Sequence, residues 1–225
     1  MNKYTILGTL VVLIVLMGSA AAIAPATTTW ISETRGTEAA AGSDITEGGN
    51  ITVLNLSVSE ITDRWAGYLG NLSGNITLRN AAGTAMYLWT WDATQGGEVC
   101  SGTAASYTWS ALAVTTAAEI DNAWSFGGAS DNATNTFTDG GCTGNITIAG
   151  IGPMATTMAD TGGAGGFETC AVEDAGAPAM DDLLFCSKVN GAGDTAYDGT
   201  TVQWELMVPV TYGSSDTYYF YAELN

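Results

Sequence analysis

Histidine is missing from all 225 residues of the chain, and lysine and arginine together number only five. Without imidazole, the chain cannot build a histidine-dependent catalytic triad or the histidine ligand sets of most catalytic zinc sites. Against 23 aspartate and glutamate residues, the formal net charge is −18 at pH 7. Such a surface repels nucleic acid and anionic lipid, so we expect no nucleic-acid partner.

Long apolar runs are also missing, except near the start. Lys3 is followed by an apolar stretch at Ile6–Met17 and by small residues up to Ala22. This order is typical of a secretory signal peptide, and we expect residues 1–22 to be removed, which leaves no stable membrane span. A retained membrane anchor is one alternative, but the run is shorter than the roughly 18 to 20 residues that cross a bilayer. The retained N-terminal helix of an archaeal pilin is another.

Cys-x-x-Cys spacing is absent, although the chain has four cysteines, Cys100, Cys142, Cys170 and Cys186. A zinc site built from these four is therefore disfavoured. An even number of cysteines in a secreted chain predicts two disulfides, in any of three connectivities. We favour sequential pairing, Cys100 with Cys142 and Cys170 with Cys186, because each pair brackets a loop-rich stretch.

Asn-x-Ser/Thr triplets are frequent, and none has proline in the middle position. They begin at Asn50, Asn55, Asn71, Asn75, Asn132 and Asn145. Six such triplets in a secreted protein predict N-linked glycans, and the asparagines should then lie in exposed turns or at outward-facing strand positions. In a bacterial host the triplets can be meaningless.

Large apolar residues are scarce between residues 23 and 49, where Trp30 and Ile31 form the one strongly apolar pair. Such a segment cannot form its own core, but its threonines favour an extended chain. We interpret residues 23–49 as an extended N-terminal arm and residues 50–225 as a single β-sandwich-like domain. Trp30 and Ile31 are then candidates for assembly, because an extended arm can pair with an open sheet edge of its own or a neighbouring copy.

Strand patterns dominate the remaining chain. Strands are predicted over 51–58, 75–78, 85–91, 145–151, 167–172, 183–189, 201–210 and 217–224. The strands 75–78 and 85–91 form a predicted hairpin around Asn80–Gly83. Short helices are predicted over 59–69 and 117–124, the second with Thr116 as N-cap. The expected fold class is mainly β, an antiparallel β-sandwich with one or two short helices.

Two loops combine oxygen ligands with turn-forming residues, as calcium sites do. One spans residues 131–135, and the other contains Asn190, Asp194 and Asp198. Neither matches an EF-hand, and a plain acidic turn is the alternative for both. We expect no cofactor, with calcium at Asn190, Asp194 and Asp198 as the one alternative.

Carboxylates for a glycosidase are abundant, but nothing singles out one pair. The candidates are Glu173–Asp174, Asp181–Asp182 and Glu205. With no catalytic constellation and no histidine, we expect the protein not to be an enzyme.

Tyr87, Trp89 and Trp91 alternate along one predicted strand and therefore share a face. They could form an aromatic sugar-binding strip, but residues of this size are more often buried, so we expect them in the core.

Three segments are rich in aromatic residues: 62–71 (TDRWAGYLGN), 86–89 (MYLW) and 217–224 (TYYFYAEL). With the leader, the glycosylation triplets and the scarcity of lysine, they make the chain resemble small secreted surface glycoproteins of archaea. Some proteins of this build form filaments by donating an N-terminal strand to a neighbour. The resemblance implies the same for this chain but identifies no functional residue.

We therefore expect a secreted structural protein of the cell surface, a glycosylated subunit of an extracellular filament or surface layer that associates with copies of itself. One alternative is a secreted module that binds carbohydrate or calcium. The other is a secreted hydrolase that uses carboxylates.

Overall fold

The structure is a computed structural model that describes residues 23–38, 40–43, 45–142, 148, 157–162, 166–174, 176 and 178–225. The expected signal peptide at 1–22 lies outside the described residues, as does the strand expected over 145–151 apart from Ile148. Within the described part of the chain, no helix is long and apolar enough to cross a membrane.

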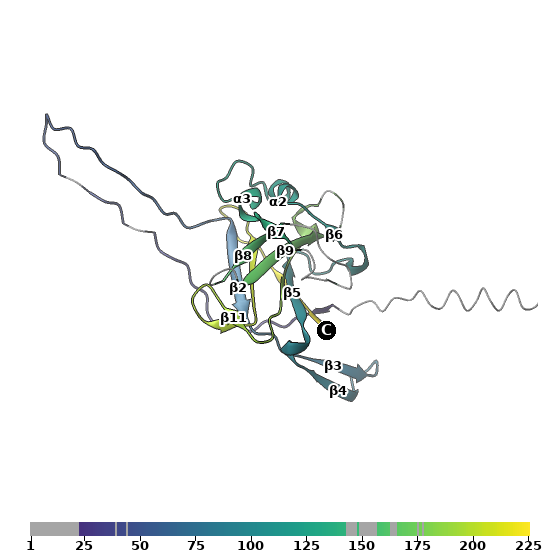
Figure 1. Cartoon of the computed structure of the whole chain (residues 1–225). Helices are drawn as coiled ribbons and strands as arrows, with labels where there is room; N and C mark the ends of the chain where they lie inside the picture. The colour runs from purple at the N-terminus through teal and green to yellow at the C-terminus, as the bar shows by residue number, and fades with distance from the viewer. Residues whose placement is uncertain are drawn as a thin grey trace, which may run out of the picture.

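One antiparallel sheet of eight strands forms the centre of the body (Figure 1). Its order is β1-β14-β5-β10-β9-β8-β7, and β6 also pairs with β9. These strands are β1 (Ala24–Pro25), β5 (Gly97–Gly102), β6 (Ala113–Val114), β7 (Asp139–Gly141), β8 (Thr157–Thr161), β9 (Phe167–Glu173), β10 (Leu183–Lys188) and β14 (Tyr219–Leu224).

Three two-stranded sheets complete the strand structure of the described residues. They are β2 (Trp65–Gly70) with β13 (Trp204–Pro209), β3 (Gly74–Arg79) with β4 (Ala85–Trp91), and β11 (Asp194–Thr195) with β12 (Thr201–Val202). The helices are α2 (Ala117–Trp124) and α3 (Ala133–Thr136), with single 3-10 turns η1 (Ala93–Gln95), η2 (Trp109–Ala111) and η3 (Met180–Asp182).

The β2–β13 pair lies across one face of the main sheet and gives the fold its sandwich character. Strand β13 contacts β9 and β10 but pairs with neither. Between the layers, Leu206 of β13 and Phe185 of β10 are fully buried in one cluster with Ile120 and Trp124 of α2. The expected class, a mainly β antiparallel sandwich with two short helices, is confirmed.

The opposite face of the main sheet has its own core. Leu184 and Cys186 of β10 point there, and they cluster with Tyr107, Ile148 and Tyr221. Because successive strand residues point to opposite faces, β10 is buried on both of its sides.

The two disulfides link Cys100 to Cys186 and Cys142 to Cys170, so the expected sequential pairing is wrong. Cys100 on β5 and Cys186 on β10 face each other in register, and their Cα atoms are 4.1 Å apart. The sheet order brings stretches that are distant in sequence side by side. The spacing of cysteines along the chain therefore does not predict which of them pair. Disulfides of this kind indicate an oxidising compartment.

The helix at 117–124 is confirmed, and its first turn explains why. The Thr116 hydroxyl accepts a hydrogen bond from the Glu119 amide at 3.3 Å, and the Glu119 carboxylate accepts one from the Thr116 amide at 2.7 Å. This reciprocal capping box satisfies two amides that the helix leaves without partners. Ile120 and Trp124 then lie on the buried side.

Most of the predicted strands are also confirmed. The hairpin turns where expected, with Gly83 at φ 85°, a left-handed conformation that favours glycine. Strands β9, β10 and β14 lie where the sequence predicts them, and the run 201–210 divides into β12 and β13 at Gln203.

Two local predictions are wrong. Residues 65–70 form strand β2 rather than part of a helix, because pairing with β13 overrides the helix-like spacing of Trp65 and Tyr68. Residues 51–58 are not a strand, because no described segment pairs with them. They belong to the long projection that the chain forms ahead of β2 (Figure 1).

We predict that proteolysis without reduction, followed by mass spectrometry, will recover peptides linking Cys100 to Cys186 and Cys142 to Cys170. The double substitution Cys142→Ser, Cys170→Ser should lower the free energy of unfolding by about 3 to 4 kcal/mol, since it opens a closed loop of about 28 residues. Denaturant titration measures the loss. A peptide linking Cys100 to Cys142 would refute this connectivity.

Candidate assembly site

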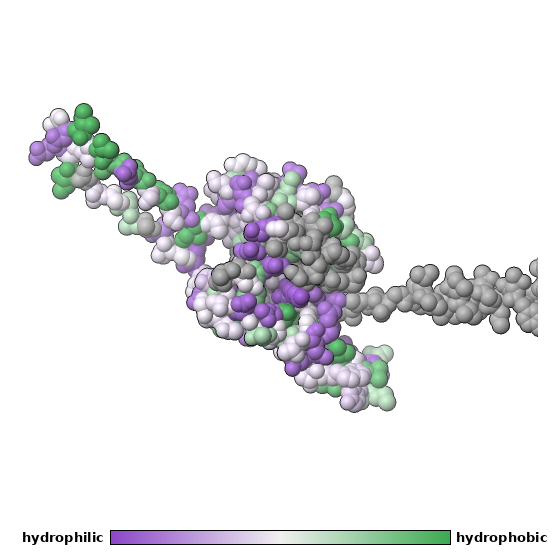
Figure 2. Space-filling view, viewed as in Figure 1, coloured by the Kyte–Doolittle hydropathy of each residue, from purple (hydrophilic) through white to green (hydrophobic). Residues whose placement is uncertain are grey.

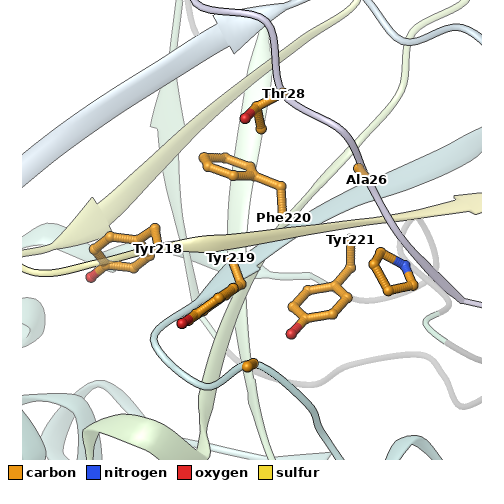
Figure 3. Close-up of a pocket in the computed structure, with 8 residues that line it drawn as sticks. Ala26, Thr28, Tyr218, Tyr219, Phe220 and Tyr221 are labelled. Atoms are coloured by element: carbon orange, nitrogen blue, oxygen red, sulfur yellow. The ribbon is translucent and has the colours of Figure 1, made fainter.

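The start of the arm lies on the outer edge of β14. In β1, Ala24 is opposite Ala222 and Pro25 is opposite Tyr221, and the Ala26 amide donates to the Phe220 carbonyl at 2.8 Å. Figure 3 shows Ala26 and Thr28 on a chain that passes beside β14. Only two arm residues are in the strand, and proline has no amide hydrogen to donate, so this edge is held by few hydrogen bonds.

A shallow pocket lies where the arm crosses the aromatic end of β14. It holds about 180 Å³, and its lining consists of Pro25, Ala26, Thr28, Ala105 and the run Tyr218–Tyr221. Binding pockets for small molecules usually hold about 300 to 1,000 Å³. The pocket therefore suits a side chain of an extended peptide better than a complete small ligand.

Trp30 lies beside an aromatic cluster next to this pocket. Its ring is edge-on to Tyr68 at 6.4 Å, and Tyr68 is in turn edge-on to Phe220 at 4.9 Å. Trp30 remains 69% exposed and Ile31 95% exposed. The sequence identified Trp30 but not the cluster it contacts; the only signal was the aromatic run 218–221.

The tyrosines of this cluster are neutral at pH 7, and burial raises their pKa further. Desolvation raises the pKa of Tyr218, with the charge of Asp216 acting in the same direction, and it also raises the pKa of Tyr68. The Tyr218 hydroxyl donates to the Pro209 carbonyl, which ties β14 to the end of β13. The cluster is thus a fixed, uncharged surface on an acidic protein.

The projecting part of the arm closes on itself at its base. Arg35 forms an ion pair with Asp63 at 2.5 Å, which joins the outgoing and returning halves of the projection. Both side chains are largely exposed, so this pair orients the base but adds little stability.

The aromatic strip of β4 is only partly in the core, which corrects the expectation of full burial. Trp91 is buried, but Tyr87 is 58% and Trp89 49% exposed, with ring centroids 4.7 Å apart. The reason is that β3 and β4 pair only with each other and project from the body (Figure 1).

The glycosylation triplets are mostly accessible. Asn50, Asn55, Asn71 and Asn75 are exposed. Asn132 is half-buried because its side chain caps helix α3 by accepting from the Asn135 amide at 2.8 Å. Asn145 lies outside the described residues.

The acidic loop proposed for calcium uses its oxygens locally. Asn190 accepts from the Ala192 amide, Asp194 from the Thr195 amide at 2.7 Å, and Asp198 from the Thr200 amide and hydroxyl. Such bonds are typical of polar turns. In the described ranges, no three histidine, cysteine, aspartate or glutamate side chains gather as metal ligands do. Calcium at this loop stays a prediction.

The loop at 131–135 likewise has structural partners. The Asp131 carboxylate accepts from the Thr62 hydroxyl at 2.6 Å and from the Arg64 guanidinium at 3.1 Å. Hydrogen bonding by Thr62 lowers the pKa of Asp131. These contacts fix the base of the projection against the helical end of the body.

The carboxylates considered for hydrolysis are engaged elsewhere. Asp181 accepts from the Thr103 hydroxyl, Asp182 from the Ala179 amide, Asp174 from the Thr108 amide, and Glu205 from the Tyr197 amide. The Asp182 bond caps the turn η3, and the other three join segments far apart in the sequence or fix a turn.

Glu173 differs from the other carboxylates. It is 6% exposed, and its Oε2 atom has no hydrogen-bond partner among the described residues. Burial raises the pKa of its carboxyl, with the charge of Glu119 adding to the effect and a hydrogen bond from Thr115 opposing it. This charge therefore destabilises the fold at neutral pH.

No known protein family matches this sequence, and no curated protein or solved structure is detectably similar to it.

We predict that Glu173→Gln stabilises the protein at pH 7. The free energy of unfolding should rise by about 1 kcal/mol, which corresponds to a Tm increase of about 2 to 4 °C. Because the folded-state pKa is raised, the wild type loses stability as pH rises through that pKa, so the difference should be nearly gone near pH 4, just below the ordinary glutamate pKa of about 4.3. Thermal melts across this range measure it. Glu47→Gln, at an exposed position, is the control, and an equal gain at pH 4 would contradict the explanation.

Proposed function

We propose that the protein is a secreted structural component of the cell surface, a glycosylated subunit of an extracellular filament or surface layer. The observation that carries the proposal is an extended arm with Trp30 exposed beside the sparsely bonded edge of β14. Two disulfides and accessible glycosylation triplets fit an extracellular location.

Assembly follows from exchanging the arm between copies. The contacts that residues 24–26 make with β14 in one chain are equally available to the arm of a neighbour. In the exchanged form, Trp30 would act as an anchor against the aromatic cluster of the acceptor. A contact of this kind is head-to-tail, and it generates an open polymer if the rotation between copies does not close.

A carbohydrate-binding module is the second candidate, favoured by the exposed pair Tyr87 and Trp89. Aromatic faces of this kind stack on sugar rings. Calorimetry with soluble polysaccharides separates the two functions, since a carbohydrate module would give binding heat that Trp89→Ala removes.

We predict that the chain 23–225 forms polymers at high concentration in its native salt and that deletion of residues 25–45 abolishes them. The deletion removes the strand contact at Pro25 and the anchor Trp30 but leaves the disulfides intact. Electron microscopy and light scattering report the result, with Thr29→Ala as a control in the same arm. A wild type that stays monomeric, or a deletion that polymerises equally, would refute the proposal.

A further inference from the structure

Residues 51–58 form a second exposed apolar segment, separate from Trp30. Ile51, Val53, Leu54, Leu56 and Val58 are between 61% and 95% exposed. Their sequence favours a strand, yet their backbone pairs with no other described residue. We call residues 51–58 the donor segment.

The β3–β4 hairpin carries an uncovered apolar face. Ile76 pairs with Trp89 and Leu78 with Tyr87, so these four side chains lie on one side of the hairpin. They are between 47% and 58% exposed, whereas ordinary hairpins bury such a face against a body. Figure 2 shows hydrophobic colouring on both the projection and the hairpin, which leave the body on different sides.

The base of the hairpin is fixed, so the hairpin cannot bury this face by folding onto its own body. Trp91 is buried, and its indole donates to the Gly96 carbonyl at 3.2 Å. A Cβ on Gly74 would lie 2.6 Å from the Leu224 side chain, which shows how closely the hairpin meets the end of β14. The apolar face is therefore held outward, beside the end of β14, the strand proposed to accept the arm of a neighbour.

We propose that the donor segment of one copy pairs with the β3–β4 hairpin of a second copy as a third strand. This rests on the proposed function and adds a second contact to the arm exchange. The donor segment and β4 are of similar length, eight and seven residues, so an extended donor segment rising about 3.3 Å per residue would match β4 along its length. Pairing satisfies open backbone groups on both partners and covers both apolar faces.

Charge favours this pairing over other contacts between copies. Residues 74–91 contain no aspartate or glutamate and one arginine, Arg79, although the whole chain carries −18. The donor segment is uncharged and is flanked by Glu47 and Glu60. The two elements can therefore meet without the repulsion that opposes other faces of this protein.

Two glycosylation triplets, at Asn55 and Asn75, leave one apolar side of each element free. In an extended donor segment, Asn55 shares a side with Ile51 and Val53 and points away from Leu54, Leu56 and Val58, because alternate residues face opposite sides. On the hairpin, Asn75 pairs with Thr90 on the side opposite the apolar face. Glycans at both positions would point outward from the paired strands.

The arrangement of the two elements predicts a polymer rather than a closed dimer. Figure 1 shows the projection leaving the body on one side and the hairpin on the other. A copy that donates at one end and accepts at the other joins its neighbours head-to-tail.

Two variants of the chain 23–225 test this. The first, Ile76→Asp with Trp89→Asp, blocks the hairpin, and the second, Leu54→Asp with Leu56→Asp, blocks the donor segment. Each alone should need at least tenfold higher concentration than the wild type to polymerise. Mixed one to one, below the concentration at which either variant polymerises alone, they should form heterodimers, because each pair keeps one intact donor segment and one intact hairpin. Native mass spectrometry identifies which monomers, heterodimers and larger species are present.

Thr77→Asp with Thr90→Asp, on the opposite face of the hairpin, where Thr77 pairs with Leu88, is the matched control and should polymerise like the wild type. Circular dichroism and disulfide mapping check that every variant is folded. Variants that polymerise normally overturn the inference and leave the proposed function standing, whereas a monomeric wild type overturns both. The inference is also overturned if the variants lose polymers but form no heterodimers when they are mixed. It is overturned as well if the only change in the variants is a loss of polysaccharide binding.

Discussion

Burial of strand β10 on both faces is the constraint on which the rest of the body depends. Leu183, Phe185 and Cys186 are all fully buried, although they point to opposite sides of the sheet. One side needs the β2–β13 layer and helix α2, and the other needs the loops around Tyr107 and Cys142. The disulfide from Cys100 then joins β10 to its neighbour β5, so both cores are tied to one strand.

The distribution of apolar surface follows from this arrangement. The body buries its apolar residues in four clusters, the two largest on opposite faces of the main sheet, while most large exposed apolar residues lie on the arm, the donor segment and the hairpin. A chain with a net charge of −18 has few surfaces on which copies can approach each other. Contacts between copies would therefore be most favourable at the donor segment and the hairpin, where Arg79 is the only charged residue.

In the proposed assembly, the two-residue strand β1 would pair either with β14 of its own chain, as a closed monomer, or with β14 of a neighbour, as a polymer. If a neighbouring copy supplied β1, it could make the same pairing with β14, so the balance would depend on concentration and on contacts made only in the polymer. The proposed contact of the donor segment with the hairpin is of that kind, whereas Trp30 already contacts Tyr68 within one chain. In this proposal, β14 is the acceptor edge, and the extended arm is the segment that reaches it from a neighbouring copy.

The sequence by itself determined the features that neighbouring residues settle. The capping box of Thr116 and Glu119, the glycine turn at Gly83 and the alternating C-terminal strands are local, and the structure confirms each. The arm pair Trp30 and Ile31 was visible as the only apolar pair in a polar stretch. Tertiary structure alone decided the cysteine pairing, the strand at Trp65–Gly70 and the exposure of Trp89. These depend on which strands become neighbours, and that choice is made by burial across the whole chain rather than by local propensity.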